Sequence, residues 1–209
     1  MDKKFRKPVS EIFLPDMLDG EGDIIPIIAD GDDGDLEDVE VPEQIPILSL
    51  RNTVLFPGVV LPISIGRPKS IQLIKEAYRN DKIVGTVAQI DPEIENPDYS
   101  DLHSIGTIGQ IVKLLEMPYG STTAIIQGRK RMVLNELVSN DPYFIARVKT
   151  LPEVKPDLLS KDFDAIVGSL KDLSLKIIKI NPNISPEASF AIKNIENNTY
   201  LINFICSNT

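Results

Sequence analysis

Two short stretches of this sequence carry side chains that could bind phosphate. Residues 66–70 are Gly-Arg-Pro-Lys-Ser, with a basic residue directly before a serine, as in phosphate-binding loops. They lack the glycine spacing of G-x-x-x-x-G-K-[ST] and a preceding buried strand, so we predict no nucleotide site there. Residues 129–131, Arg-Lys-Arg, form the only basic cluster that could contact nucleic acid; a solvated turn between two strands is the competing interpretation.

Side chains that serve nucleophilic or metal chemistry are scarce. Cys206 is the single cysteine and His103 the single histidine, which excludes an internal disulfide, a cysteine-based zinc site and a histidine-rich metal centre. We expect Cys206 to be a core residue rather than a reactive thiol. We expect His103 to lie at the surface or to be hydrogen bonded, because no second ligand is near it in the sequence.

Motifs of known hydrolases are also missing. Neither G-x-S-x-G nor H-E-x-x-H occurs. Paired carboxylates are confined to residues 1–44 and 91–101, where solvation would not shift their pKa values usefully. Composition does not exclude a catalytic Ser-Lys dyad, because both residue types are common in the sequence, but no particular pair is indicated. We therefore predict that residues 1–209 hold no active site, no metal and no cofactor.

The negative charge of the chain lies in its first 44 residues. These contain 14 acidic and 4 basic side chains, and the other 165 residues contain 17 and 18. A nearly neutral remainder argues against a dedicated nucleic-acid-binding protein. Residues 1–44 are predicted to be an acidic, disordered tail. Residues 24–28 form an apolar island in this tail. The island either adds a strand to a sheet edge, of this chain or of a partner, or is an apolar segment that makes only nonspecific contacts.

No segment of the sequence indicates a membrane span or a secretion signal. No apolar run approaches the roughly 20 residues that cross a bilayer, and the first residues, MDKKFRKPVSEIF, contain no apolar stretch of signal-peptide length. We therefore expect a cytoplasmic protein.

Residues 45–66, IPILSLRNTVLFPGVVLPISIG, predict two strands joined by a shaped loop. The strands are expected at 45–50 and 59–65, and Phe56-Pro57-Gly58 forms the turn, because proline presets φ and glycine tolerates positive φ. Pro46 and Pro62 each remove a ladder donor, so they belong at edges, strand starts or bulges.

Further strands and one helix follow up to residue 153. An apolar stripe predicts a helix at 68–80. Alternating or apolar runs predict strands at 83–90, 105–115, 122–127, 132–138 and 143–150, with a hairpin turn at 117–121. Gly106 and Gly109 suggest bulges or a sharp curl, and Gly128 marks a bend. Residues 45–153 are therefore predicted to form a compact, mostly β domain with a curled sheet.

From residue 157 the hydrophobic period becomes helical. A first helix is expected up to residue 181, a second after Ser185 as N-cap, and a third at 199–206. The third helix stops without capping residues, so we expect residues 157–209 to be an α-helical subdomain that is truncated at its C-terminal end.

Several short strings occur in the same order and with the same gaps as in a known family. They are PILSLRN at 46–52, FPG at 56–58, VAQ at 87–89, IGT at 105–107, QGxxR at 127–131, PYF at 142–144 and KINPxIxPE at 179–187. From about residue 45 to the end, the chain resembles the amino-terminal domain of Lon-type ATP-dependent proteases. The resemblance implies an α+β fold, a PUA-like β pseudo-barrel with one helix followed by an α-helical bundle segment.

The resemblance also implies a function. In that family the domain recognises unfolded or damaged polypeptide and supports assembly of a hexamer. It is joined to an ATPase module and a serine protease domain with a Ser-Lys dyad. The complete protein would then be an ATP-dependent serine endopeptidase of protein quality control that uses ATP and Mg²⁺. None of those catalytic parts lies in these 209 residues, so this chain is expected to be non-catalytic.

Binding of unfolded polypeptide requires exposed apolar surface or free sheet edges rather than a catalytic constellation. Our candidate substrate-binding residues are Phe56, Pro57, Val59 and Tyr119, all in or beside shaped loops. The alternative for Phe56 and Tyr119 is that their side chains fill the core beneath the sheet. The alternative function is a free-standing PUA-like module that binds a small molecule or nucleic acid, supported only by Arg129, Lys130 and Arg131. A hydrolase in its own right has no supporting constellation.

Overall fold

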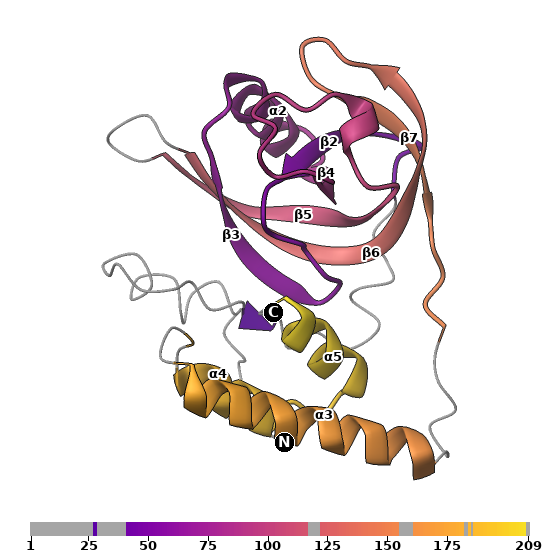
Figure 1. Cartoon of the computed structure of the whole chain (residues 1–209). Helices are drawn as coiled ribbons and strands as arrows, with labels where there is room; N and C mark the ends of the chain where they lie inside the picture. The colour runs from indigo at the N-terminus through magenta and orange to yellow at the C-terminus, as the bar shows by residue number, and fades with distance from the viewer. Residues whose placement is uncertain are drawn as a thin grey trace, which may run out of the picture.

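The computed structural model describes residues 27–28, 41–116, 122–154, 161–181, 184 and 186–207. A curled β-sheet with one helix lies above a group of three helices (Figure 1). The elements are β1 (Ile27–Ile28), β2 (Gln44–Leu50), β3 (Val59–Ile65), α2 (Pro68–Arg79), β4 (Ile83–Ala88), η2 (Tyr99–Asp101), β5 (Ile105–Glu116), β6 (Thr122–Ser139), β7 (Ile145–Thr150), α3 (Lys161–Ile180), α4 (Pro186–Asn194) and α5 (Asn198–Cys206). The predicted α+β class is confirmed.

The sheet closes on itself through its longest strand. The strand order is β1-β3-β6-β5-β4-β2-β7, and β7 also pairs with β6. The first part of β6 pairs with β3 and the last part with β7, so this one strand serves both ends of the curled sheet. Only the β2–β4 pair is parallel among the strands described. The predicted pseudo-barrel is the result.

Glycines sit where strands approach other backbone closely. The pairing of β5 with β6 shifts register between Ile108 and Gly109, as the sequence predicted for Gly109. A Cβ atom at Gly128 would lie 2.1 Å from the carbonyl oxygen of Phe56. The predicted division into strands at 122–127 and 132–138 is wrong: β6 runs unbroken from Thr122 to Ser139, because glycine admits the 56–58 turn against the strand without ending it.

The prolines of β2 and β3 occupy tolerated positions. Pro46 is the last β2 residue paired with β7, and Ile47 is the first paired with β4, so the missing N–H falls where the strand changes partners. Pro62 lies in β3, which pairs with β6 on one side and, over two residues, with β1 on the other.

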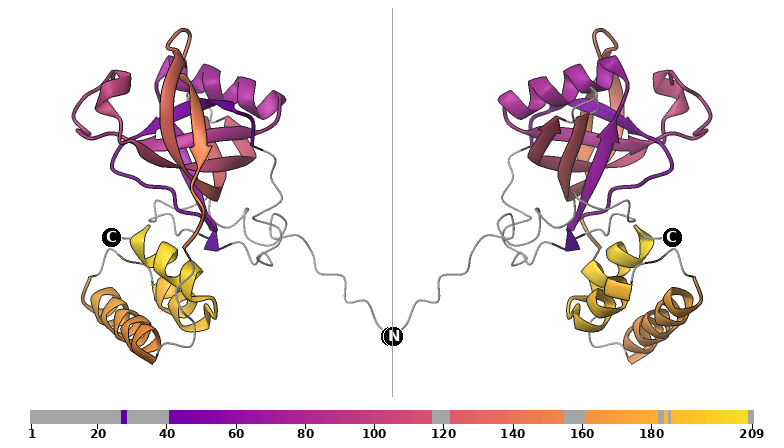
Figure 2. Two further views of the ribbon diagram at one scale, coloured as in Figure 1. Left: turned by 90° about the vertical axis from the view of Figure 1, so that its right-hand side faces the viewer. Right: turned by 90° about the vertical axis from the view of Figure 1, so that its left-hand side faces the viewer.

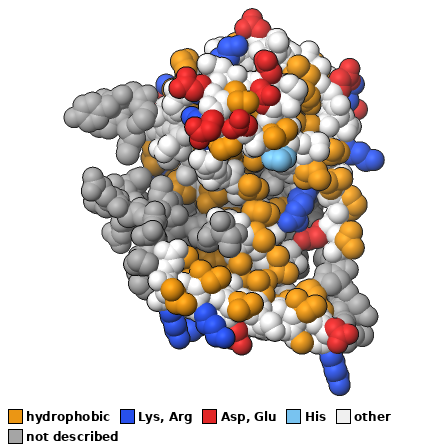
Figure 3. Space-filling model, viewed as in Figure 1, with side chains coloured by type: hydrophobic (Ala, Val, Ile, Leu, Met, Phe, Trp, Pro, Cys, Tyr) orange, Lys and Arg blue, Asp and Glu red, His pale blue; other side chains and the backbone are white. Residues whose placement is uncertain are grey.

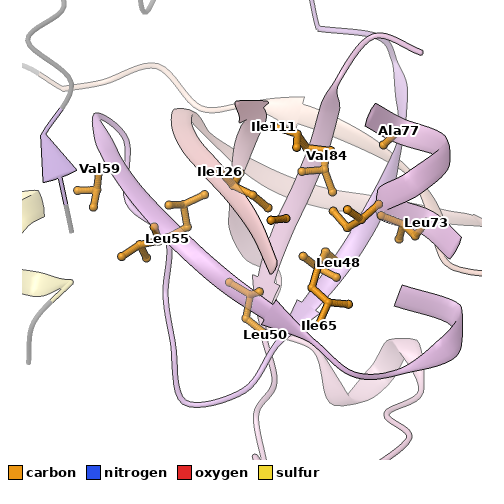
Figure 4. Close-up of a cluster of buried hydrophobic side chains, with 13 residues drawn as sticks. Leu48, Leu50, Leu55, Val59, Ile65, Leu73, Ala77, Val84, Ile111 and Ile126 are labelled. Carbon is orange, nitrogen blue, oxygen red and sulfur yellow. The ribbon is translucent and has the colours of Figure 1, made fainter. Parts of the chain in front are cut away.

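Two buried clusters fill the barrel. The larger joins β2, β3 and α2 and includes Leu48, Ile65 and Leu73 (Figure 4). The smaller includes Ile45, Ile108 and Met132. Phe144, Ala146 and Val148 all pack in the smaller cluster, as predicted from the alternation of residues 143–150. Strand β7 itself begins only at Ile145.

A third cluster holds the helices together. Its buried members are Val167, Ala188, Ile192, Leu201, Phe204 and Ile205. Asn197 caps α5 by accepting a hydrogen bond from the backbone N–H of Tyr200 at 3.1 Å. The prediction that Cys206 is a core residue is wrong, since it is exposed. Phe204 and Ile205 already face the core, and the next residue is turned about 100° further around the helix.

Several predictions concern residues outside the described ranges. They are the disorder of most of residues 1–44, the turn at 117–121 and the cap at Ser185. The boundaries at residues 44, 153 and 157 stay predictions. Among the described residues, no helix combines the length and apolar character that crossing a membrane requires.

Candidate functional site

The turn formed by Phe56, Pro57 and Gly58, here called the 56–58 turn, is fixed against the barrel. Gly58 has a φ of 81°, which glycine adopts at little cost, and its N–H donates to the carbonyl of Gly128 at 2.9 Å. The hydroxyl of Thr107 donates to the carbonyl of Leu55 at 2.6 Å, just before the turn. The turn is therefore a shaped and held surface rather than a loose loop.

Helix α5 packs on this turn. Asn203 is 2% exposed, and its amide nitrogen donates to the carbonyl oxygen of Pro57 at 2.9 Å. Its Oδ1 accepts a hydrogen bond from Nη2 of Arg131 at 2.8 Å. The Arg131 guanidinium carbon lies 6.0 Å from the centre of the Phe56 ring, within cation–π range. The 56–58 turn is thus a contact between the barrel and the helices.

The predicted substrate-binding residues lie in different surroundings. Phe56 is half-buried and packs against the larger barrel cluster, and Pro57 is half-buried under α5. Val59 is 1% exposed and lies opposite Ile28 of β1. Tyr119 is outside the described residues. Their contact with substrate stays a prediction, and at Val59 it requires that the side chain become accessible.

A larger apolar surface lies on α3. Spacings of seven, four and three residues place four large side chains on one side of this helix, here called the α3 outer face. Their exposed fractions are 66% for Ile166, 56% for Leu173, 52% for Ile177 and 81% for Ile180. Val167 and Ser174, which lie about 100° further around the helix than Ile166 and Leu173, are buried. The helix therefore has apolar residues both toward its neighbours and toward solvent.

The helical group exposes one more large apolar side chain. Phe190 of α4 is 72% exposed. Figure 2 shows α3 on the far side of the helical group from α5, and Figure 3 shows hydrophobic side chains gathered over the lower part of the molecule, where the helices lie. An exposed apolar patch of this kind indicates an interaction site.

The basic cluster at residues 129–131 is largely engaged within the chain. It lies inside β6, so the predicted solvated turn is wrong. Arg129 donates from Nε to the side-chain oxygen of Gln110 at 3.0 Å. Arg131 donates a hydrogen bond to the side-chain oxygen of Asn203. A cluster that bonds to its own fold is a poor phosphate site.

Residues 66–70 do not fit a nucleotide. The guanidinium of Arg67 donates to the Ser49 hydroxyl at 2.8 Å and to the side-chain oxygen of Gln89 at 2.6 Å. Burial is the main cause that lowers the pKa of Arg67. Pro68 begins α2 without an N–H, so this helix start offers a phosphate one donor fewer.

Metal chemistry also finds no support in the described part of the chain. It contains no group of three or more His, Cys, Asp or Glu side chains that could hold a metal ion. His103 is exposed, as predicted.

Sequence reasoning missed the roles of Asn203 and of the α3 outer face. An asparagine within the apolar run Tyr-Leu-Ile-Asn-Phe-Ile of α5 was a signal, because such a residue needs partners when buried. In α3, apolar residues cover more of the helix than a single stripe, which indicates a second contact surface.

Comparisons with known proteins agree on one family. The model of the ATP-dependent protease La (LON) substrate-binding domain matches residues 44–209. A Lon protease of Flavobacterium johnsoniae is 50% identical over 191 residues, which cover 91% of this chain and 23% of that protein. A Lon protease of Parabacteroides distasonis is 45% identical over 196 residues, covering 92% of this chain and 24% of that protein. The chain spans about a quarter of the length of these curated relatives.

Solved structures show the same fold. The N-terminal domain of a Mycobacterium avium complex Lon protease has a TM-score of 0.60 at 18% identity, covering 77% of this chain and 80% of that one. A Lon N-terminal domain protein from Xanthomonas campestris has a TM-score of 0.50 at 13% identity, covering 76% and 94%. The sequence matches and the shared fold together show that this chain belongs to the Lon protease substrate-binding domain family.

Proposed function

We propose that this chain binds unfolded or damaged polypeptide through the α3 outer face and delivers it to the rest of an ATP-dependent protease of Lon type. The family is described as a substrate-binding domain, and the relatives are Lon proteases. The observation that carries the proposal is the row of four exposed large side chains on α3.

The chemistry of such a surface suits unfolded chains. Folding normally buries large aliphatic side chains, and an unfolded polypeptide exposes them. Contact between two apolar surfaces is favourable by about 25 cal/mol per Å² removed from water and needs no particular orientation. A surface that binds in this way accepts many sequences, which a protease acting on damaged proteins requires.

The remaining parts of the activity are assigned to the complete protein. In this proposal ATP, Mg²⁺, the Ser-Lys dyad and the hexamer belong to the segments that the longer relatives contain. The rest of the protease chain is the competing occupant of the α3 outer face.

The test is a charge substitution on that face. The probe is fluorescein-labelled, reduced and carboxymethylated α-lactalbumin. The double variant Leu173→Glu with Ile177→Glu should bind it about tenfold more weakly or worse, because two apolar side chains that binding would remove from water have been replaced by charged ones. Binding is measured by fluorescence anisotropy, with circular dichroism to verify the fold.

The matched control is Lys161→Glu. It changes the net charge by the same −2, and Lys161 is exposed at the start of the same helix, away from the outer face. The control should bind the unfolded chain as the wild type does. If the double variant also binds like the wild type, the α3 outer face is not the substrate surface. If the wild type does not bind, the proposed function fails.

The free-standing nucleic-acid module receives no support from the geometry. Its only basis was the basic cluster, of which Arg129 and Arg131 bond to Gln110 and Asn203.

A further inference from the structure

Strand β3 has an outer edge that is paired with a segment of the acidic tail. Along its other edge, β3 pairs with β6 from Val60 to Ile65. On the outer edge, Ile27 lies opposite Val60 and Ile28 opposite Val59, in antiparallel register. Among the described residues, β1 is the only strand on this edge. The tail segment thus shows that the edge accepts an added strand.

The edge is short because of its own sequence. Pro62 cannot donate a hydrogen bond, and proline is tolerated in strands where its missing N–H faces an open edge. The pairing observed on this edge lies at Val59 and Val60 and involves only the two residues of β1. Such a short pairing is weak and can be exchanged.

The position of the edge suits contact with an incoming chain. Figures 1 and 2 place β1 between the barrel and the helices, and Figure 4 shows it beside Val59. Gly58, the residue before β3, lies against Tyr200 of α5, since a Cβ atom there would be 2.9 Å from the Tyr200 ring. The edge therefore begins where the barrel and the helical group meet.

We propose that β1 is a tethered competitor of substrate: the outer edge of β3 binds short, extended, apolar segments of unfolded polypeptide, and residues 27–28 occupy it until such a segment displaces them. This inference rests on the proposed function and adds a second contact and its regulation. Backbone pairing to a sheet edge is largely independent of sequence, and β-branched residues such as isoleucine favour the extended conformation.

The tail has the properties of an exchangeable occupant. Because it is part of the same chain, its effective concentration near the edge is high even though each contact is weak. Asp23 precedes the island and Asp30 follows it. Charged residues beside a short apolar strand limit how far its pairing can extend. A substrate segment without flanking acidic residues therefore has an advantage once it arrives.

The first experiment measures binding of the tail sequence supplied as a separate peptide. A fluorescein-labelled peptide of residues 22–30, GDIIPIIAD, is titrated with the full chain and with the double variant Ile27→Pro and Ile28→Pro. Proline at both positions removes the two backbone donors and leaves the charge unchanged. The variant should bind the peptide about fivefold more tightly than the wild type, because its edge is no longer occupied.

The control is Leu36→Pro, which alters the same acidic tail outside the paired segment. It should bind the peptide as the wild type does. Equal affinity for all three proteins, or no binding of the peptide to any of them, overturns the proposal.

The second experiment tests whether the edge and the substrate share a site. Unlabelled, reduced and carboxymethylated α-lactalbumin should displace the peptide from the Ile27→Pro, Ile28→Pro variant. Failure to displace it overturns the role of the edge in substrate binding. The proposed function is judged separately, by binding of the unfolded chain to the wild type and by the effect of the Leu173→Glu, Ile177→Glu variant on that binding.

Discussion

Arg131 of β6 and Asn203 of α5 are joined by a hydrogen bond of 2.8 Å although 72 residues separate them in the sequence. The same Asn203 donates to the carbonyl of Pro57, so one buried amide connects three segments of the chain. The carbonyl of Pro57 and the guanidinium of Arg131 both depend on this side chain. Asn203 therefore fixes the helical group against the barrel.

Replacement of Asn203 by alanine should lower the free energy of unfolding by about 1–3 kcal/mol, because buried polar partners lose their hydrogen bonds. Urea denaturation followed by circular dichroism measures the change. The control Asn194→Ala removes a hydrogen bond to the carbonyl of Phe190 at an exposed position and should cost less than about 0.5 kcal/mol. Equal effects of the two substitutions would show that Asn203 does not join the parts.

The 56–58 turn gives a second prediction through Gly58. Alanine at this position should destabilise the protein by about 1–3 kcal/mol, because its φ of 81° is strained for a residue with a Cβ and that atom would press on the Tyr200 ring. Gly66→Ala is the control, since no atom lies within 4 Å of the Cβ position there. Thermal unfolding of the two variants compares them directly, and a stable Gly58→Ala protein would mean that the turn and α5 are not in contact.

Much of the fold was predictable because local rules decide it. Strand β3 ends just before Gly66, where the apolar pattern stops. Helix α2 begins at Pro68, a residue that is favoured in the first turn of a helix. The third helix was predicted at 199–206, and α5 begins at Asn198 with Asn197 as its cap. Glycine and proline mark such boundaries reliably, because their effects on φ and on hydrogen bonding do not depend on distant residues.

The errors arose where long-range packing decides the outcome. Two strands were predicted around the bend at Gly128, but one strand continues through it because the glycine makes room for the carbonyl of Phe56. Cys206 was assigned to the core by its apolar neighbours, and its exposure depends on how α5 is rotated against the other helices. The burial of Val59 on β3 was likewise not predicted, and its contact with substrate stays a prediction. Sequence patterns do not show how an element is oriented against distant parts of the chain.

Two leucines distinguish the core of the helical group from its outer face. Leu201 is 1% exposed, so Leu201→Ala should cost about 2–5 kcal/mol of unfolding free energy through lost burial and a residual cavity. Leu173→Ala, on the α3 outer face, should change stability by less than about 0.5 kcal/mol. Chemical denaturation of both variants tests the difference. A large loss at Leu173 would place that side chain in a core and remove it from the proposed substrate surface.

The pair Tyr143 and Glu76 should make stability depend on pH at both ends of the scale. The Tyr143 hydroxyl donates to a carboxylate oxygen of Glu76 at 2.5 Å. This hydrogen bond, followed by burial, raises the pKa of Tyr143 from 10.0 to about 12. The same bond, with a second from Gln72, lowers the pKa of Glu76 below 4.5.

The sign of each effect follows from linkage. The raised pKa of Tyr143 contributes stability that is complete below pH 10 and is lost as the pH rises through about 12. The lowered pKa of Glu76 contributes stability that is present above pH 4.5 and is lost as the pH falls through the lowered value. In Tyr143→Phe the contribution of Tyr143 disappears, and the contribution of Glu76 decreases to the part that the Gln72 hydrogen bond and Arg79 provide. The difference in unfolding free energy between wild type and variant, measured by urea denaturation from pH 3 to pH 12, should therefore be largest between about pH 5 and pH 10 and should shrink on either side. A difference that stays constant over this range would mean that the hydrogen bond between Tyr143 and Glu76 does not form in solution.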